Sequence, residues 1–418
     1  MTARSAIVVG GGIAGSTAAL ALARAGLRPT VVEMRTGPAQ DAGVMLTLAT
    51  NGIDALRVLD VDGPALAAGF PTPEIVLRSH TGKHLGATPT GVPLADGTVS
   101  HTLRRADLNT VLRDEVTARG IPVVTGTVVA VEEHADRVRA VLSDGSSVDA
   151  DLLVGADGVH SRVRSSMDPP APGPSYAGLV TTGGFAPDSA VVGPERDGAG
   201  TGAYEMVFGR RAFFGSATAP DGVVWWFVNV PLAPEPDRRE LREVPTAEWR
   251  RRLAALFADD AGAARATIDA TADFAPMTPI HTLPHLPRWH TGRCVLVGDA
   301  AHAPSPTSGQ GASLAAEDAV VLAQCLRSQD DPGDAFALFE SVRRPRVERI
   351  VRAAARINNS KAAGPVARRV RDLVLPAVLR LSATSSLTQY DHHLEWSDEP
   401  GARQPAGRRG SWARVGGR

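Results

Sequence analysis

The residues whose types and spacing could do chemistry stand in one segment of the C-terminal half, which reads GDAAH at residues 298–302 and GQG at residues 309–311. An apolar run at residues 294–297 precedes it, and a helical apolar period follows from Ala312. Asp299 could accept hydrogen bonds from a polyol hydroxyl. The helix start offers free backbone N–H groups and the positive end of a dipole to a group that becomes negative. The segment therefore suits a ligand with a polyol chain and a polarisable ring.

A second segment, GGGIAG at residues 10–15, has the spacing G-x-G-x-x-G. It follows an apolar run at residues 6–9 and opens an Ala-rich pattern that predicts a helix to about Ala25. The next predicted strand ends at Glu33, 18 residues after Gly15. In such a unit the glycines allow a tight turn, a close pyrophosphate and helix–strand packing, and the acid accepts hydrogen bonds from ribose hydroxyls. The unit predicts FAD or NAD rather than NADP, whose 2′-phosphate Glu33 would repel.

A third element, Asp157-Gly158, ends another predicted strand and is followed by Ser161, Arg162 and Arg164. Either arginine could serve nicotinamide phosphates or form structural ion pairs. Together the three elements would hold an adenosine ribose, a pyrophosphate, a polyol and a ring that accepts negative charge. FAD has an extended ribityl chain and a ring that becomes anionic on reduction, and NAD has neither. The combination predicts FAD.

On these motifs the chain resembles the FAD-dependent aromatic hydroxylases. These are the single-component (group A) flavoprotein monooxygenases typified by para-hydroxybenzoate hydroxylase, salicylate hydroxylase and the tetracycline-inactivating monooxygenases. Two more segments match the family, RADL at residues 105–108 and FESVRRP at residues 339–345. The similarity runs from about residue 4 to about residue 390, with the motifs in the family's order.

The resemblance implies tightly bound, non-covalent FAD and NAD(P)H as a transient co-substrate that gives up a hydride and leaves. It implies a flavin C4a-hydroperoxide that inserts one oxygen atom from O2 into a small molecule. Arg105 would contact the FAD phosphates, Asp299 a ribityl hydroxyl, and Asp157 the region between the pyrophosphate and the nicotinamide approach. The N–H groups of Gly311 and Ala312 would face the N1–C2=O edge of the flavin and stabilise negative charge there. The expected cofactor residues are Gly10, Gly12, Ile13, Ala14, Gly15, Glu33, Arg35, Arg105, Val128, Asp157, Asp299, Gly309, Gly311 and Ala312.

The substrate is less determined, because the inserted segment has no match to the phenol ligands of the para-hydroxybenzoate enzyme. Its strand-like runs are apolar, which favours a hydrophobic, aromatic or polycyclic substrate lying between this layer and the flavin. Candidate lining residues are Phe208, Phe214, Trp226 and Pro306. Strand alternation leaves open that Trp226 is a structural residue pointing away from the substrate. No catalytic acid or base is assigned, since the flavin performs the chemistry.

Other activities fit the same FAD domain. An epoxidase or a reductase would carry the same motifs, and a non-enzymatic redox sensor would bind FAD without substrate-stimulated NAD(P)H oxidation. A halogenase would carry W-x-W-x-I-P and a nearby catalytic Lys. Residues 225–231 read WWFVNVP, and the only lysines are Lys83 and Lys361.

The composition fits a soluble globular protein: 418 residues, net charge −1, 43% hydrophobic and 21% charged. This balance gives no basic field for nucleic acid. No apolar run reaches the ~18 residues of a membrane span, and the N-terminus enters a strand too soon for a signal peptide. We expect a cytoplasmic monomer or homodimer that takes a small-molecule substrate and O2.

The remaining polar candidates favour structural roles. Cys294 and Cys325 lie on apolar patterns and are interpreted as reduced core thiols. No other metal-ligating residues accompany His281, His285 and His290 in the sequence, so no metal is expected. For His302, support of its loop is favoured over proton transfer.

The pattern as a whole predicts an α/β fold (α+β overall), a Rossmann-like FAD-binding domain with an inserted antiparallel β-rich substrate domain and C-terminal helices. The FAD-binding domain would be discontinuous, at residues 1–70, 103–172 and 277–345. The substrate domain would comprise residues 71–102 and 173–276. A C-terminal helical region would follow at 346–396, and the Gly/Arg-rich residues 397–418 are predicted to be a disordered tail.

Overall fold

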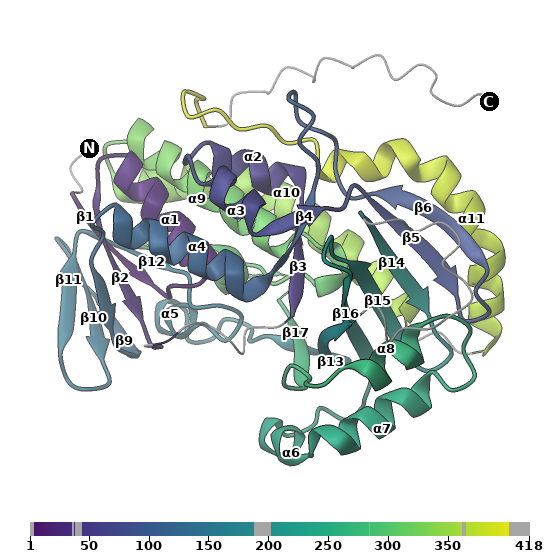
Figure 1. Cartoon of the computed structure of the whole chain (residues 1–418). Helices are drawn as coiled ribbons and strands as arrows, with labels where there is room; N and C mark the ends of the chain where they lie inside the picture. The colour runs from purple at the N-terminus through teal and green to yellow at the C-terminus, as the bar shows by residue number, and fades with distance from the viewer. Residues whose placement is uncertain are drawn as a thin grey trace.

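The computed structural model describes residues 4–35, 37, 44–187, 202–283, 285–361 and 365–400. It has two main parts, a nucleotide-binding-type α/β layer and a large sheet with its own helices (Figure 1). Most of the predicted tail, residues 401–418, lies outside the described residues.

The apolar runs of the sequence form a five-stranded parallel sheet. Ile7, Leu153 and Val295 are fully buried in it, as expected for parallel strands that are covered on both faces. The strand order is β18-β12-β1-β2-β8, with bounds β1 (Ser5–Val9), β2 (Arg28–Glu33), β8 (Val123–Thr125), β12 (Leu152–Gly155) and β18 (Cys294–Leu296).

Helices pack on this sheet through small residues. Ala18 and Ala21 of α1 and Ala316 and Ala319 of α9 are buried, which lets the α1 and α9 backbones lie close together. These helices and their neighbours are α1 (Ile13–Arg24), α2 (Thr50–Arg57), α3 (Asp62–Ala67), α4 (Arg105–Ala118), α5 (Arg162–Met167) and α9 (Gly311–Ser328). A three-stranded antiparallel sheet flanks α5, formed by β9 (Val128–Glu133), β10 (Val138–Leu142) and β11 (Ser147–Ala150).

The inserted segment forms a seven-stranded sheet in the order β17-β13-β16-β15-β14-β5-β6. It is antiparallel except for the parallel pair β14–β5. Its strands are β5 (Glu74–Ser79), β6 (His84–Pro89), β13 (Ser175–Pro187), β14 (Ala203–Phe208), β15 (Phe213–Thr218), β16 (Val223–Pro231) and β17 (Thr278–Thr282). The chain also contributes α6 (Arg238–Glu243), α7 (Thr246–Leu256) and α8 (Ala264–Ala270) beside it.

A small sheet joins the two parts. It has the order β3-β7-β4, with β3 (Met45–Leu48), β4 (Gly69–Pro71) and β7 (His101–Arg104). Strand β3 contacts α9 on the nucleotide-binding side and β16 on the large sheet. It therefore places the start of α9 near one face of the seven-stranded sheet.

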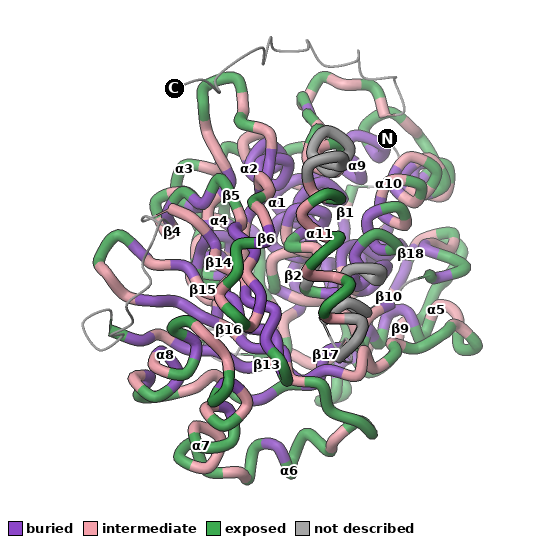
Figure 2. The backbone as a smooth tube through the Cα atoms, turned by 90° about the vertical axis from the view of Figure 1, so that its right-hand side faces the viewer, coloured by how far each residue is buried: buried purple, intermediate pink, exposed green. Residues whose placement is uncertain are grey.

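Two domain limits differ from the sequence prediction. Strand β17 pairs with β13, so the large sheet continues past residue 276. Helix α10 (Pro332–Lys361) runs through the expected limit at 345 with Pro345 inside it. Helix α11 (Pro365–Ser386) then packs along β6 and leads to the short helix η4 (Leu387–Gln389). Figure 2 shows the buried backbone concentrated in the two sheets and α9, with α6, α7 and α11 more exposed. The predicted fold class is confirmed.

Candidate functional site

The first site element is the turn between β1 and α1, where three glycines meet different surroundings. Gly10 has φ 101°, and a Cβ there would lie 2.6 Å from the carbonyl oxygen of Ala156. A Cβ on Gly15 would overlap the carbonyl oxygen of Gly10, whereas one on Gly12 meets nothing within 4 Å. Gly12 is the N-cap residue of α1, and no side-chain hydrogen bond caps the helix there. The start of α1 thus presents backbone N–H groups to open space, as a pyrophosphate site requires.

Glu33 lies beside this turn at the end of β2. Its carboxylate accepts hydrogen bonds from the backbone N–H groups of Gly11 (2.5 Å) and Arg35 (2.9 Å). These bonds hold an acceptor next to the start of α1, where an adenosine ribose would lie. Of the other residues predicted to contact the dinucleotide, Ile13 and Ala14 are partly buried at the helix start, Arg35 is exposed, and Val128 is buried in the core.

The Asp157 carboxylate holds the start of α5 in place. Its carboxylate accepts hydrogen bonds from Ser161 Oγ (2.5 Å) and from the backbone of Arg162 and Val163, at the start of α5. Burial raises the pKa of the Asp157 carboxyl group, and the hydrogen bonds, which lower it, offset this rise only in part. Arg164 is buried and donates to the carbonyl oxygens of Val159 and Ala300. The Asp157 motif therefore braces the loop that carries Asp299, and Arg164 is engaged structurally rather than free for a nicotinamide phosphate.

Asp299 lies in the short helix η2 (Gly298–Ala300) that follows β18. Burial raises the pKa of its carboxyl group, and the positive field of Arg105 and His302 opposes that rise. Within the described residues, no group donates a hydrogen bond to this carboxylate. A desolvated acceptor without a donor is costly in the empty protein and fits a ligand hydroxyl.

The loop from Pro306 to the start of α9 is the third element. It forms the short helix η3 (Pro306–Ser308), then Gly309 at φ 60°, and α9 starts at Gly311. No side chain caps α9, and a Cβ at Gly311 would meet nothing within 4 Å. Pro306 and Gly309 are exposed, and Gly311 and Ala312 are partly exposed. The helix start can therefore approach a ring that becomes negative.

Two buried amides beside this helix start were missed by the sequence reasoning. Asn51 Nδ2 donates to Gln310 Oε1 (3.0 Å) and to Glu317 Oε1 (2.6 Å). Gln310 is fully buried, yet its Nε2 donor has no partner among the described residues, and neither has Asn51 Oδ1. Unpaired buried amide groups call for a ligand or water.

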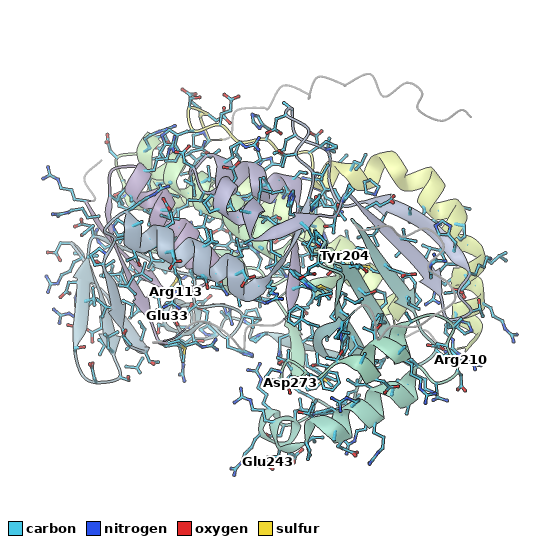
Figure 3. The ribbon with its side chains drawn as sticks, in the orientation of Figure 1. Glu33, Arg113, Tyr204, Arg210, Glu243 and Asp273 are labelled. Carbon is cyan, nitrogen blue, oxygen red and sulfur yellow. The ribbon has the colours of Figure 1, made fainter. Side chains whose placement is uncertain are left out.

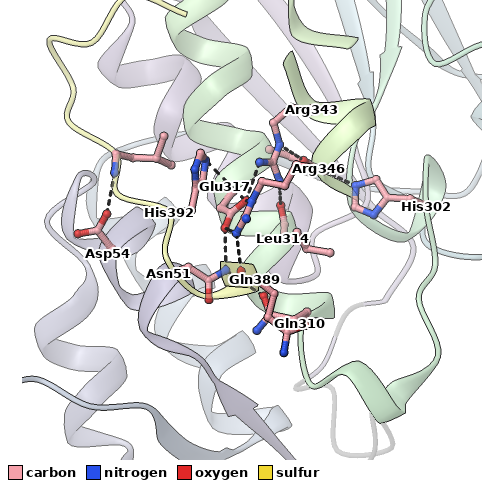
Figure 4. Close-up of polar contacts among 12 residues, drawn as sticks. Asn51, Asp54, His302, Gln310, Leu314, Glu317, Arg343, Arg346, Gln389 and His392 are labelled. Carbon is pink, nitrogen blue, oxygen red and sulfur yellow. Dashed lines mark hydrogen bonds and ion pairs between the residues drawn. The ribbon is translucent and has the colours of Figure 1, made fainter. Parts of the chain in front are cut away.

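A buried charge cluster lies behind the loop (Figure 4). Asp318 Oδ2 is bonded to His302 Nε2 (2.6 Å) and to the backbone N–H of Gly298 (2.9 Å), and its Oδ1 accepts from Arg343 Nε (2.8 Å). Glu317 pairs with Arg343 and Arg346. Burial alone would raise the pKa of Glu317, but the two arginines hold it well below its usual range. His302 thus supports its loop, and the cluster fixes α9 against α10.

The large sheet has two aromatic faces. On the face toward α7 and α8, Trp226 stacks on Phe214 at 5.7 Å and donates to Thr271 Oγ1 at 2.8 Å. Both rings belong to the core that includes Leu253 and Phe257. Strand alternation turns Trp226 and Phe214 toward α7 and α8 and away from the nucleotide-binding part, which does not favour the prediction that they line the substrate.

Phe208 lies farther along the sheet. It packs edge-on against Phe213, under Arg371 of α11 and beside Leu379. Strand alternation puts it on the same face as Tyr204, and its hydrophobic cluster shares Met206 and Phe227 with the rings near β3. Its contact with the substrate stays a prediction.

The opposite face carries Trp225, Phe185, Phe70 and Tyr204, packed with Met45 of β3. Figure 3 labels Tyr204 in the large sheet, far from Glu33 in the nucleotide-binding part. Tyr204 is buried, and burial raises its phenol pKa. Since β3 also contacts α9, this aromatic face is the one that lies toward the Pro306 loop. Strand neighbours at 225 and 226 could not be told apart by sequence alone.

Within the described ranges, no group of three or more His, Cys, Asp or Glu residues could hold a metal ion. None of the described helices is both long and apolar enough to cross a bilayer.

Comparisons with known sequences agree with this geometry. A family model for an FAD binding domain matches residues 4–354. The chain is 31% identical over 366 residues to aurachin C monooxygenase/isomerase of Stigmatella aurantiaca, covering 85% of this chain and 89% of that protein. It is 33% identical over 359 residues to 3-amino-4-hydroxybenzoate 2-monooxygenase of Streptomyces platensis, covering 82% and 85%. With 3-hydroxybenzoate 6-hydroxylase of Klebsiella oxytoca the identity is 30% over 395 residues, covering 88% and 91%.

Solved structures agree as well. Klebsiella pneumoniae HpxO complexed with FAD and uric acid superposes with a TM-score of 0.80 at 25% identity, covering 93% of this chain and 96% of that one. The tetracycline destructase Tet(55) shares the fold, with a TM-score of 0.68 at 19% identity over 95% and 99% of the two chains.

Proposed function

The chain belongs to the FAD-binding aromatic hydroxylase family and is an FAD-dependent monooxygenase, and from that premise we propose an NAD(P)H-consuming enzyme that transfers one oxygen atom from O2 to an aromatic small molecule. The observation that carries the cofactor assignment is a set of unfilled polar groups. Among the described residues, Asp299 has no hydrogen-bond donor and Gln310 Nε2 has no acceptor, and no side chain caps the start of α1 or of α9. These groups fit a ribityl chain, a flavin edge and a pyrophosphate.

In this proposal Gly12 and the α1 N–H groups hold the pyrophosphate, and Glu33 holds the adenosine ribose. Arg105, the first residue of α4, adds positive charge for the phosphates. Asp299 binds the ribityl chain, and Gly311 and Ala312 place the positive end of α9 beside the ring. The chemistry supplied by FAD, when bound, is hydride acceptance from the nicotinamide and activation of O2 for transfer of one oxygen atom.

The protein's own contribution to catalysis would be electrostatic and steric. The start of α9 stabilises negative charge on the ring, and the helix is held rigidly by the buried pairs of Glu317 and Asp318 with Arg343. The apolar face around Trp225 and Phe185 excludes water from the reacting centre. The names of the relatives concern hydroxybenzoates, aurachin C and quinolones, which supports a monocyclic or bicyclic aromatic substrate. We place it between this face and the Pro306 loop.

The test is spectroscopic and kinetic. Purified protein is expected to be yellow and to release FAD, not FMN, on denaturation. A screen of hydroxybenzoates and 4-quinolones should find a compound that stimulates NAD(P)H oxidation and O2 consumption together, with an oxygen atom from 18O2 in the product. Reduction of the substrate without O2 uptake would instead identify a reductase. FAD binding without any stimulated oxidation would favour a sensor. Gel filtration would decide between the monomer and homodimer.

A further inference from the structure

The Arg104 side chain packs against aromatic rings on the face of the large sheet where we place the substrate. It is the last residue of β7 and pairs with Met45 of β3. Its guanidinium carbon lies 4.5 Å from the ring centre of Phe185 and 5.2 Å from that of Trp225. Both rings belong to the aromatic face that lies toward the Pro306 loop.

Apart from its contact with the two rings, the Arg104 guanidinium has no partner among the residues that the structure describes. Within the described part of the chain, the Arg104 side chain makes no ion pair and no hydrogen bond, and it is exposed to solvent. Most other arginines near the core are engaged, such as Arg164 with two carbonyl oxygens and Arg343 with two carboxylates. Stacking on rings orients a guanidinium while its five N–H donors stay free at the edge.

A second free donor lies on the same rings. Trp225 is 94% buried, since its exposed fraction is 6%, and its indole Nε1–H has no partner among the described residues. A buried indole N–H ordinarily finds an acceptor. Together Arg104 and Trp225 offer several donors and no acceptor, which is complementary to an oxygen anion.

The adjacent arginine serves the other ligand. Arg105 begins α4, and its positive charge opposes the burial-driven rise in the pKa of Asp299. Arg104 instead contacts the rings of the large sheet. Two successive arginines thus face two different sites, because the chain changes there from a strand to a helix.

Building on the proposed function, we propose that Arg104 is a specificity-determining residue that binds an anionic oxygen of the aromatic substrate, a ring carboxylate or an enolate, with Trp225 Nε1 as a second donor. The aromatic ring of the substrate then lies along Phe185 and Trp225. This departs from the sequence-based expectation of a hydrophobic, aromatic or polycyclic substrate, because an anionic oxygen that lies beside aromatic rings is stabilised by a cation next to it.

The experiment measures equilibrium binding to the FAD-loaded enzyme through the change in flavin absorbance. The probes are two matched pairs, 3-hydroxybenzoate with 3-hydroxybenzamide and 4-hydroxyquinoline-2-carboxylate with its amide. Wild-type protein should bind at least one acid about 10-fold or more tighter than its amide, as a charge-assisted hydrogen bond implies. Arg104→Met should abolish that preference, and Arg104→Lys should restore only part of it because Lys lacks the planar fork. The control Arg265→Met removes an exposed arginine of α8 and should keep the full preference.

Three outcomes would overturn the proposal. An acid preference that survives Arg104→Met assigns the anion to another group. Loss of FAD in Arg104→Met places the residue in the cofactor site. Equal binding of acid and amide by the wild type, or no binding of any of the four probes, contradicts the substrate class. Because binding is measured without turnover, these results stand apart from a failure of the monooxygenase proposal, which would appear as absent O2 consumption.

Discussion

Gly298 and Ala14 touch across the two motifs that define the cofactor site. A Cβ added to Gly298 would lie only 2.9 Å from the Cβ of Ala14, and Gly298 has φ 58°. Glycine at 298 therefore serves both the left-handed turn and the close approach to α1. The contact sets Asp299 beside the start of α1, so that one extended ligand can reach both.

The glycines of the first turn should separate cofactor binding from folding. Gly12→Val is expected to leave the fold intact, because Gly12 has ordinary backbone angles and open space around it, and to abolish FAD binding by filling the pyrophosphate space. Gly15→Val should instead unfold or strongly destabilise the protein, since its side chain would meet the carbonyl of Gly10. Circular dichroism melting and flavin absorbance distinguish the two. Retained FAD in Gly12→Val would contradict the assignment of this turn to the pyrophosphate.

The Asp299 carboxyl group should strengthen FAD binding and lower the stability of the cofactor-free protein. Asp299→Asn is expected to weaken FAD binding by about 1.5–3 kcal/mol, the usual loss for a hydrogen bond to a charged group. The cofactor-free variant should be more stable than wild type at neutral pH, because burial disfavours the ionised form of the Asp299 carboxyl group and raises its pKa, whereas Asn carries no charge. The pKa of Asp299 is higher in the folded protein than in the unfolded chain, so ionisation of this group lowers the stability of the fold. This loss of stability is complete above the folded pKa and disappears below the ordinary Asp pKa. Urea unfolding of the apoprotein at neutral and acidic pH measures it. A less stable Asn variant at neutral pH would refute this account.

The buried pair of Glu317 and Arg343 should be a major source of stability. Glu317→Gln leaves Arg343 under-compensated inside the protein and should lower the free energy of unfolding by about 3–5 kcal/mol. The folded pKa of Glu317 is depressed, so its contribution is present above the ordinary Glu pKa and is lost as the pH falls toward the folded pKa. The difference between wild type and variant should therefore shrink on acidification. The control Glu248→Gln, a surface pair on α7, should change stability by less than about 1 kcal/mol.

The two neighbouring tryptophans should respond differently to the same substitution. Trp226→Phe removes the hydrogen bond to Thr271 and leaves space under α8, so it should lower stability by about 1–3 kcal/mol without changing how NAD(P)H is used. Trp225→Phe should retain FAD and raise the fraction of NAD(P)H that ends as H2O2, because a substrate-side donor is lost. Peroxide per NAD(P)H, measured with a stimulating substrate, checks this. Equal coupling in both variants would mean that neither face covers the reacting centre.

Both cysteines should be inert in the native protein. Cys294 and Cys325 are buried, and burial raises the pKa of each thiol to about 12. At pH 8 almost no thiolate is present, so a thiol reagent should label neither residue until the protein unfolds. Labelling of either cysteine at a rate independent of denaturant would show local opening of α9 or β18.

Much of the fold and the cofactor assignment followed from the sequence because both depend on local rules. Glycines at 10, 12 and 15 are required by the geometry of one turn, and the strand predicted to end at Glu33 is β2, which ends there. The FAD assignment was confirmed by the family match over residues 4–354.

What the sequence by itself determined was therefore the cofactor, the fold class and the elements that carry the motifs. Only the tertiary structure decided which side chains of the large sheet lie toward β3 and the nucleotide-binding part. A period-2 pattern puts Trp225 and Trp226 on opposite faces of the sheet, but it does not say which of the two faces α7 and α8 cover, because that depends on packing between distant segments. The same holds for Glu317, whose partner Arg343 is on another helix, and for Arg104, whose contact with the rings of Phe185 and Trp225 joins distant segments. Such contacts join residues that are close in space but far apart along the chain, so their spacing in the sequence does not reveal them.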